Sequence, residues 1–579
     1  MSDHAHAPQS LLSRVFSTDH KVIARQYLYL GLVGLLVAGL FALMIRWQLA
    51  YPGDAFPVLG NMFWSETGGV MPPEFYNMLF TMHGAMMVFF AITPIVIGAF
   101  GNFAIPLQLG AEDMAFPFVN MLSFWVMFLG AVIMAISFFM PGGAAGGGWT
   151  AYPPLSGVAE YGVGHGQTLW LLGIAFAGTS SLLGSVNYVV TTLNMRCEGM
   201  TLMRMPLTIW GLFCTAVLNL LWIPVVAAAL FMVFMDRTAG TAFFLSGPGS
   251  MFAEGGSLAG QAGGQPLLFQ HLFWGFGHPE VYILIFPVWG LVGDLLSTFS
   301  RKPAFGYKAT VLSMLTILFL SQIVWGHHMF TSGMSPLLGT AFTFLTITIS
   351  VPTAVFFLNW LGTIWRGSLR FTPPMLFALG VVFVFGIGGL TGLFLALQAL
   401  DIWLHDTYFV VGHFHFTLAA SVFFGTFAGI YYWFPKMFGK SMNQSLGKLH
   451  FYTSFVSLTF VFFMMMYIGA TGAHPRRIAD PSAYNFLTPF LDANVLIGWG
   501  SQFLGLVQLI FVWNFVTSLM SGEQAPDNPW EASSLEWVAP TPPPHGNFPV
   551  APTVYRGPHE FNAPETGERG WLTQAEPSV

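Results

Sequence analysis

The stretch DTYFVVGHFHFTLAASVFFGTFAGIYYWF, residues 406–434, decides the fold class. After Asp406 it contains no acidic residue and no Lys or Arg, and it exceeds the ~20 apolar residues with which a helix crosses a bilayer. A membrane β-strand needs only about 10 residues, so the stretch predicts a helix. It also contains His413 and His415, and an ionisable side chain inside a span is a functional hypothesis by default.

Eleven more apolar runs of similar length precede or follow this stretch. They lie at 27–48, 75–104, 116–140, 167–193, 207–235, 270–298, 309–330, 336–364, 373–397, 449–470 and 493–520. The composition agrees, because 55% of the residues are hydrophobic and 8% are charged, whereas soluble domains carry about 25% charged residues. We therefore expect an all-α integral membrane protein, a twelve-helix bundle over 27–520 between an N-terminal segment (1–26) and a polar, Pro-rich tail (521–579).

The amino-acid composition and net charge argue against several other classes of protein. Two cysteines in 579 residues cannot form a disulfide scaffold, and a net charge of -6 argues against nucleic-acid binding. Residues 1–25 lack the apolar core of a cleavable signal peptide. Lys and Arg concentrate in the loops on the N-terminal side of the bundle, and the opposite loops hold only Arg237, Arg476 and Arg477. The positive-inside rule then predicts cytoplasmic termini, in the inner (cell) membrane of a prokaryote.

Six of the 16 histidines fall at one depth in the predicted bundle. They are His83, His278, His327, His328, His413 and His415. At ~1.5 Å of rise per residue, all six lie roughly 5–15 Å beneath the outer surface. Chance would scatter them, so the layer predicts a functional site in the membrane.

Helical geometry divides this set of histidines. His413 and His415 are ~200° apart around their helix and cannot share one metal. His278 and Tyr282 share a face, whereas Glu280 between them points away. Neutral imidazoles suit haem iron or copper, and a three-His site favours Cu or Zn over Mg or Ca. The pattern predicts two haem-like centres and one three-His metal beside a tyrosine, which is membrane redox chemistry.

Five sequence strings resemble subunit I of the A-type haem–copper oxidases, and the resemblance covers nearly the whole chain. They are GHPEVY (277–282), WGHHMF (325–330), LHDTYFVVGHFHF (404–416), GGGWTAYPPL (146–155) and LEWVAPTPPP (535–544). The resemblance implies the catalytic subunit of a terminal respiratory oxidase, an enzyme that reduces O2 to water and couples this reaction to proton translocation.

The resemblance also implies a role for each matching position. His83 and His415 would bind the low-spin haem iron and His413 the high-spin haem iron. The copper would be held by His278, His327 and His328, with Tyr282 covalently joined to His278. The remaining cofactor positions are Arg46 at a haem ring substituent, Trp149, Arg476 and Arg477 at haem propionates, and His405 and Asp406 at a magnesium ion. Arg46 suits the formyl group of haem a, while haems b and o stay open.

Two proton pathways of the family can be compared with this chain. Small polar groups match the D pathway, and they are Asp113, Asn102, Asn120, Ser123, Ser180, Ser181, Asn187 and Glu280. The K pathway departs from the pattern, because Phe356 in PTAVF replaces the pathway Lys, although Thr353 remains. Gly293 and Asp294 stand where the family commonly has Ser and His, and Phe118 replaces an Arg. Either Asp294 belongs to another proton entrance, or the D pathway supplies all protons.

The electron donor follows from four positions that are polar in quinol oxidases of this superfamily. Here they are Val37, Phe41, Phe75 and Met78, all apolar, which favours cytochrome c. No paired-Cys copper motif is present, so electrons would enter through a subunit II, and a subunit III is expected. The alternatives are a quinol oxidase, a nitric oxide reductase of the same superfamily, and, from another class, a non-redox proton or metal transporter.

Overall fold

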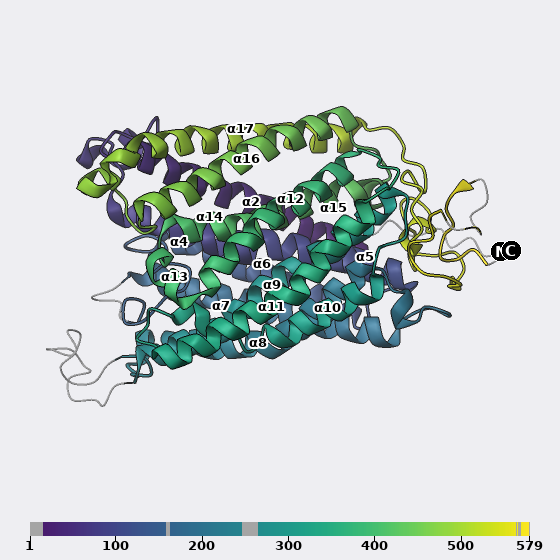
Figure 1. The fold of residues 1–579 in the computed structure, drawn as a ribbon, viewed down its shortest axis with the longest axis horizontal. Coiled ribbons are helices and arrows are strands. Elements are labelled where there is room, and N and C mark those ends of the chain that lie inside the picture. The colour runs from purple at the N-terminus through teal and green to yellow at the C-terminus, as the bar shows by residue number, and fades with distance from the viewer. Residues whose placement is uncertain (1–14, 158–162, 246–263, 563, 565–568, 578–579) are drawn as a thin grey trace.

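The computed structural model describes residues 15–157, 163–245, 264–562, 564 and 569–577, and its secondary structure is helical (Figure 1). Within these residues, eleven helical segments are long and apolar enough to cross a membrane. They are α2 (His20–Ala50), Pro73–Leu109, Pro117–Phe139 with α6 (Pro117–Ile136), α7 (His165–Asn194), α8 (Leu207–Thr238), α9 (Pro266–Ser300), α11 (Pro336–Ile364), α12 (Pro373–Ala396), Tyr408–Phe438, α16 (Gln444–Gly472), and Asn485–Ser521 with α17 (Leu491–Ser521).

The run expected at 309–330 forms a shorter helix than the sequence predicted. Helix α10 (Tyr307–Leu320) has 14 residues and is apolar, and it ends where the chain turns at Ser321. A 3-10 turn, η6 (Trp325–Met329), follows and carries the adjacent His327 and His328. The two imidazoles therefore lie on a tight turn against the bundle rather than on a continuous helix.

Two spanning segments contain π-helical turns. Pro73–Leu109 consists of α4 (Pro73–Met86), η2 (Met87–Ile92), η3 (Pro94–Ala99) and α5 (Phe100–Leu109). Pro94 lacks an N–H for the helical ladder. Just before it, the Val88 carbonyl accepts from both the backbone N–H and the hydroxyl of Thr93, the latter at 2.7 Å.

The second of these segments consists of α14 (Tyr408–Phe414), η7 (His415–Ala420) and α15 (Ser421–Phe438). Its π-helical turn begins at His415 itself. Such turns in helices are frequently found at functional sites.

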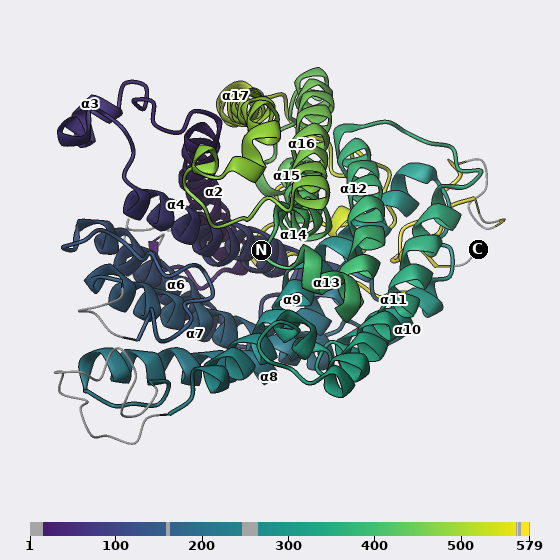
Figure 2. The ribbon, with the colours of Figure 1, turned by 60° about the vertical axis from the view of Figure 1, so that its left-hand side comes forward.

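Helix α9 and the segment Pro73–Leu109 are the most enclosed of the spanning segments, and the other helices surround them (Figure 2). Helix α8 lies along α9. A Cβ added at Gly211 or at Gly290 would come within 2.2 Å of a backbone oxygen of the other helix. Glycine at both positions lets the two backbones approach closely, which is the usual device for packing helices in lipid. This contact places α9, with His278, Glu280 and Tyr282, in the interior.

The C-terminal tail after α17 lies across one end of the bundle (yellow in Figure 1). Lys436 donates from Nζ to the Asp527 and Ala539 carbonyls at 2.8 and 2.6 Å. Arg301, at the end of α9, forms an ion pair with Glu531 at 3.5 Å. The tail therefore covers the end of the bundle where the Lys- and Arg-rich loops lie.

Glu536, an acid of this tail, has no exposed surface. Its carboxylate accepts from Gln108 Nε2 at 2.8 Å, and burial raises the pKa of Glu536 to about 7 from 4.5. Because the pKa of Glu536 is raised in the folded protein, protonation of this carboxyl group stabilises the folded state. This contribution to the free energy of unfolding is fully present below about pH 4.5 and is lost as the pH rises through about 7. The full effect is up to about 3 kcal/mol.

We expect Glu536→Gln to remove this pH dependence. Between pH 5 and pH 8, the unfolding temperature of the purified wild-type protein in detergent should fall more than that of Glu536→Gln. Parallel curves for the two proteins would contradict the assignment of a neutral, buried carboxyl group.

Candidate redox centre and proton path

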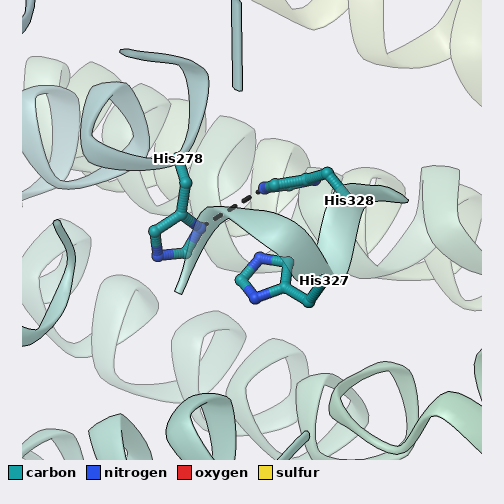
Figure 3. A group of neighbouring side chains, drawn as sticks. All are labelled: His278, His327 and His328. Atoms are coloured by element: carbon teal, nitrogen blue, oxygen red, sulfur yellow. Dashed lines mark hydrogen bonds between the residues drawn. The ribbon is translucent and has the colours of Figure 1, made fainter. Parts of the chain in front are cut away.

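Three imidazoles converge in the bundle from two elements, α9 and η6. His278 Nδ1 lies 3.3 Å from His328 Nε2, and His327 faces both rings (Figure 3). One ligand nitrogen from each of the three residues lies within 4.8 Å of the others. His278 Nε2 is buried and has no hydrogen-bond partner among the described residues. Three imidazoles whose nitrogens lie this close together, with one buried nitrogen left without a partner, fit a three-His metal site.

Neighbouring side chains fix the orientation of these rings. The Thr346 hydroxyl donates to the Phe342 carbonyl at 2.7 Å, so it accepts from His327 Nδ1 at 2.9 Å. This leaves Nε2 of His327 free as a ligand. His328 stacks on Trp274 with ring centroids 3.9 Å apart and an interplanar angle of 7°. Tyr282 lies beside the group, with its ring centroid 5.2 Å from that of His278.

The other three histidines of the layer are each fixed through Nδ1 by a backbone carbonyl. His83 faces the Ala38 carbonyl at 2.9 Å, His415 that of Val411 at 2.8 Å, and His413 that of Gly388 at 3.0 Å. Since a carbonyl only accepts, Nδ1 carries the proton and Nε2 keeps its lone pair. This tautomer is the one that ligates haem iron, so these residues fit axial ligands.

His413 and His415 contact different helices, as their spacing predicted. A Cβ added at Gly392 of α12 would lie 3.0 Å from the His413 ring, and Thr391 of α12 lies 3.0 Å from its Nδ1. The His415 ring packs on Phe462 of α16, with centroids 4.7 Å apart. The helix that carries both residues thus presents them to two different neighbouring helices.

Arg46 and Trp149 lie near these rings. Arg46 is 4% exposed, and its guanidinium donates to the Tyr408 hydroxyl and to Asn494 Oδ1, each at 3.1 Å. Its Nε is buried and has no partner among the described residues, which leaves one donor for a bound group. Trp149 packs on Trp274, with ring centroids 5.9 Å apart, and so adjoins the ring that supports His328.

Arg476 and Arg477 both contact Asp406. The distances from Arg476 Nε and an Arg477 amino nitrogen to the carboxylate are 2.6 and 3.2 Å. Burial alone would raise the pKa of Asp406, but the two guanidinium charges outweigh it and the pKa is lowered. His405 Nδ1 lies 3.5 Å from Asp401. Arg476, Arg477, His405 and Asp406 therefore lie in one polar cluster with Asp401.

Glu280 borders a cavity of about 20 Å3 between α7, α8, α9 and the segment around η2. Thr93, Ser181 and Asn219 contribute the other polar side chains of its lining. Asn219 Nδ2 is buried with no partner among the described residues. A cavity of this size and polarity has room for about one water.

Three of the predicted proton-path residues, Asn120, Ser123 and Ser180, are linked to one another through Tyr27 of α2. Tyr27 bridges Ser123 and Ser180 through its hydroxyl at 2.9 and 3.0 Å. Ser123 donates to the Asn120 carbonyl at 2.6 Å. Both polar atoms of the Asn120 amide are buried without partners among the described residues. Buried amides of this kind are normally satisfied by ordered water, so water fits this series.

Asp113 lies below this series, in the loop that joins α5 to α6. Burial raises the pKa of Asp113, and the nearby His20 opposes this shift. Asn187 holds the loop rather than standing free, since its amide bonds to the backbone of Phe116 at 2.7 and 3.2 Å. Asn102 donates to the Gly98 carbonyl at 2.7 Å.

The region of the predicted K pathway is packed with aromatic rings. Phe356 has no exposed surface. Its ring stacks on Trp289 with centroids 5.0 Å apart, and Trp360 lies 4.9 Å away. Phe385 closes the other side of Trp289, also at 5.0 Å. The Thr353 hydroxyl, one turn away, donates to its own helix at 2.9 Å.

Asp294 lies beyond these rings, and its carboxylate has four partners. It accepts from the backbone N–H groups of Leu207 and Thr208 at 3.0 and 2.9 Å and from the Thr208 hydroxyl at 2.6 Å. The tail contributes His559 Nε2 at 2.8 Å. The contact with His559 fastens the tail to the bundle.

Sequence reasoning missed three polar residues of the site. Tyr27 and Asn219 lie in apolar helices, where a single polar side chain gives no pattern to detect. Asp401 is buried beside His405, and the i,i+4 spacing of these two residues was a signal that could have found it.

The comparisons with known proteins agree on one family. The profile of the family described as cytochrome c and quinol oxidase polypeptide I matches residues 22–530. An alternative cytochrome c oxidase subunit 1 of Bradyrhizobium diazoefficiens is 43% identical over 96% of this chain and 92% of its own length. A cytochrome c oxidase subunit 1 of Synechocystis is 42% identical over 94% of this chain and 92% of its own length. A solved haem–copper terminal oxidase shares the fold, with a TM-score of 0.71 at 19% identity, over 87% of this chain and 84% of its own.

Proposed function

The chain belongs to the cytochrome c and quinol oxidase polypeptide I family and is the catalytic subunit of a terminal oxidase, and we propose that it takes electrons from cytochrome c to reduce O2 to water and translocates protons. The observation that carries the proposal is the group of His278, His327 and His328 beside Tyr282. Haem iron and copper, when bound, supply the electron transfer to oxygen.

The chain's own residues would hold these cofactors in the following way. His278, His327 and His328 direct ligand nitrogens at one point for copper. His413 would hold the high-spin haem on the α12 side, and His83 and His415 the low-spin haem on the α16 side. The unpartnered Arg46 Nε suits the formyl oxygen of a haem a. Tyr282 is placed to donate a proton next to the copper ligands, and the covalent bond to His278 stays a prediction.

The outer cluster would serve the haem propionates and a second metal. Arg476, Arg477 and Trp149 are suited to bind propionate oxygens. His405 and Asp406 would hold magnesium, in which case the Arg side chains would turn from Asp406 toward the propionates.

Protons would enter at Asp113 and reach Glu280 along the series of Asn102, Asn120, Ser123, Ser180 and Ser181. The aromatic packing around Phe356 supports this single route, because the Phe356 side chain has no polar group that could carry a proton along the K pathway. Asp294 is engaged by four donors and would fasten the tail rather than conduct.

The membrane arrangement is also proposed from the charges. The tail and the Lys- and Arg-rich loops lie at one end of the bundle, which would be cytoplasmic in a prokaryotic cell membrane. Helix α10 would be the twelfth membrane helix, so the bundle would span 27–520 between the segments 1–26 and 521–579. Cys197 and Cys214 are both free thiols, which supports electron entry through a partner subunit II, beside a subunit III.

Oxygen uptake by the purified complex tests the proposed donor. We expect rapid uptake with reduced cytochrome c and none with a ubiquinol analogue, because Val37, Phe41, Phe75 and Met78 offer a quinol head group no hydrogen bond. Uptake with the quinol alone, in the absence of cytochrome c, would contradict the donor assignment.

A further inference from the structure

One tail residue, Asn547, lies directly behind the loop that carries Asp113. It has no exposed surface and adopts a left-handed backbone with a φ of +69°. Its amide Nδ2 donates to the Ala111 and Glu112 carbonyls at 2.8 and 3.2 Å. These donations orient the amide, so Oδ1 points the other way and accepts from Lys21 Nζ at 3.0 Å.

The same Oδ1 lies 3.0 Å from His20 Nε2. On the other side of the ring, His20 Nδ1 lies 2.7 Å from the Asn102 carbonyl. A single amide therefore connects the backbone immediately before Asp113, the first turn of α2, and, through His20, the backbone of Asn102. These partners lie 435 to 527 residues from Asn547 in sequence, so the contact depends on the tertiary fold.

The Asp113 loop is held from two sides. On one side, Asn187 and Thr191 of α7 bind the backbone of Phe116 and Ala115. On the other side, Asn547 binds the backbone before Asp113. Between these anchors the Asp113 side chain accepts from the Met114 N–H at 2.7 Å, so the two anchors set where its carboxyl group lies.

We propose that Asn547 is a positioning residue of the proton entrance, holding the Asp113 carboxyl group and His20 in line with Asn102. This inference rests on the proposed role of Asp113. The amide itself neither gains nor loses a proton between pH 5 and 9. It acts through geometry, and proton transfer requires donor and acceptor within hydrogen-bond reach, directly or through one water.

Asn547→Gly tests the inference, because glycine keeps the left-handed backbone without strain and removes only the amide. We expect turnover with reduced cytochrome c to fall about tenfold, the scale of a displaced reacting group. The KM for cytochrome c and the haem and copper content should stay unchanged. Asn547→Asp keeps an oxygen toward Lys21 but turns a carboxylate oxygen toward the Ala111 and Glu112 carbonyls, so it should also slow turnover relative to the wild type, and it serves if the glycine variant does not assemble.

Gln574→Ala is the matched control within the tail. Gln574 is also buried, and its Nε2 donates to the Arg204 carbonyl at 2.9 Å, away from Asp113. This variant should turn over like the wild type. Equal slowing in Gln574→Ala and Asn547→Gly would show that the tail acts as a general anchor, and would overturn the inference.

A double variant separates this inference from the proposed function. In an Asp113→Asn background, Asn547→Gly should cause no further slowing, because both changes act on one step. Additive slowing, or wild-type turnover of Asn547→Gly beside a slow Asp113→Asn, would overturn the role of Asn547 alone. Wild-type turnover of Asp113→Asn would instead overturn the proposed proton entrance.

Discussion

Oxygen uptake is expected to vanish when His327 is replaced by alanine. His327 supplies one of three nitrogens that lie within 4.8 Å of one another, and the bond of its Nδ1 to Thr346 leaves Nε2 for a metal. Two imidazoles alone cannot hold copper in a closed three-His site. Loss of even an outer-shell partner costs 10–100-fold, so loss of a ligand should exceed about 100-fold.

Elemental analysis of the purified variant, together with its optical spectrum, checks this expectation. Copper should be lost while both haem signals remain, because His83, His413 and His415 lie on other elements. His165→Ala is the control, since this histidine is exposed at the start of α7. Full activity in His327→Ala, or equal copper loss in the control, would contradict the copper assignment.

The second large effect is expected from Asp113→Asn. If the aromatic packing around Phe356 closes the other route, every proton consumed or pumped passes Asp113. The amide keeps the size of the side chain and removes its ability to carry a proton, so turnover should fall by about tenfold or more. Oxygen uptake by the variant in detergent, and proton release by vesicles containing it, measure the two consequences.

Two other inner carboxylates serve as controls for this variant. Glu112 is the exposed neighbour of Asp113 in the same loop, and Glu112→Gln removes the same charge. Asp294→Asn removes the carboxylate that lies on the inner side of Phe356. Both variants should keep wild-type turnover, and slowing of Asp294→Asn to the level of Asp113→Asn would point to a second proton entrance.

The sequence predicted an all-helical membrane fold and the divergence of His413 and His415 because both depend on local patterns. Apolar runs follow from the energetics of lipid, and His413 and His415 diverge simply because of the helical period. The contacts of these rings agree with that reasoning, with His413 against α12 and His415 against α16.

Other features depend on contacts between distant parts of the chain. The end of α10 at Leu320 was missed because the apolar run continues through a turn that tertiary packing stabilises. Phe356 and the three rings packed near it, Trp289, Trp360 and Phe385, come from α9, α11 and α12, so sequence showed the lost Lys but not the packing that replaces it. Asn547 lies in a polar tail whose sequence gives no sign that it reaches the loop of Asp113.

The haem and metal content of the purified protein tests the central claim most directly. A pyridine haemochrome assay with elemental analysis should give two haems and one copper for each chain. Two haems with iron in place of copper would indicate the nitric oxide reductase alternative. Protein that is folded and membrane-bound but contains no haem would contradict the account and favour a transporter with a histidine-lined path.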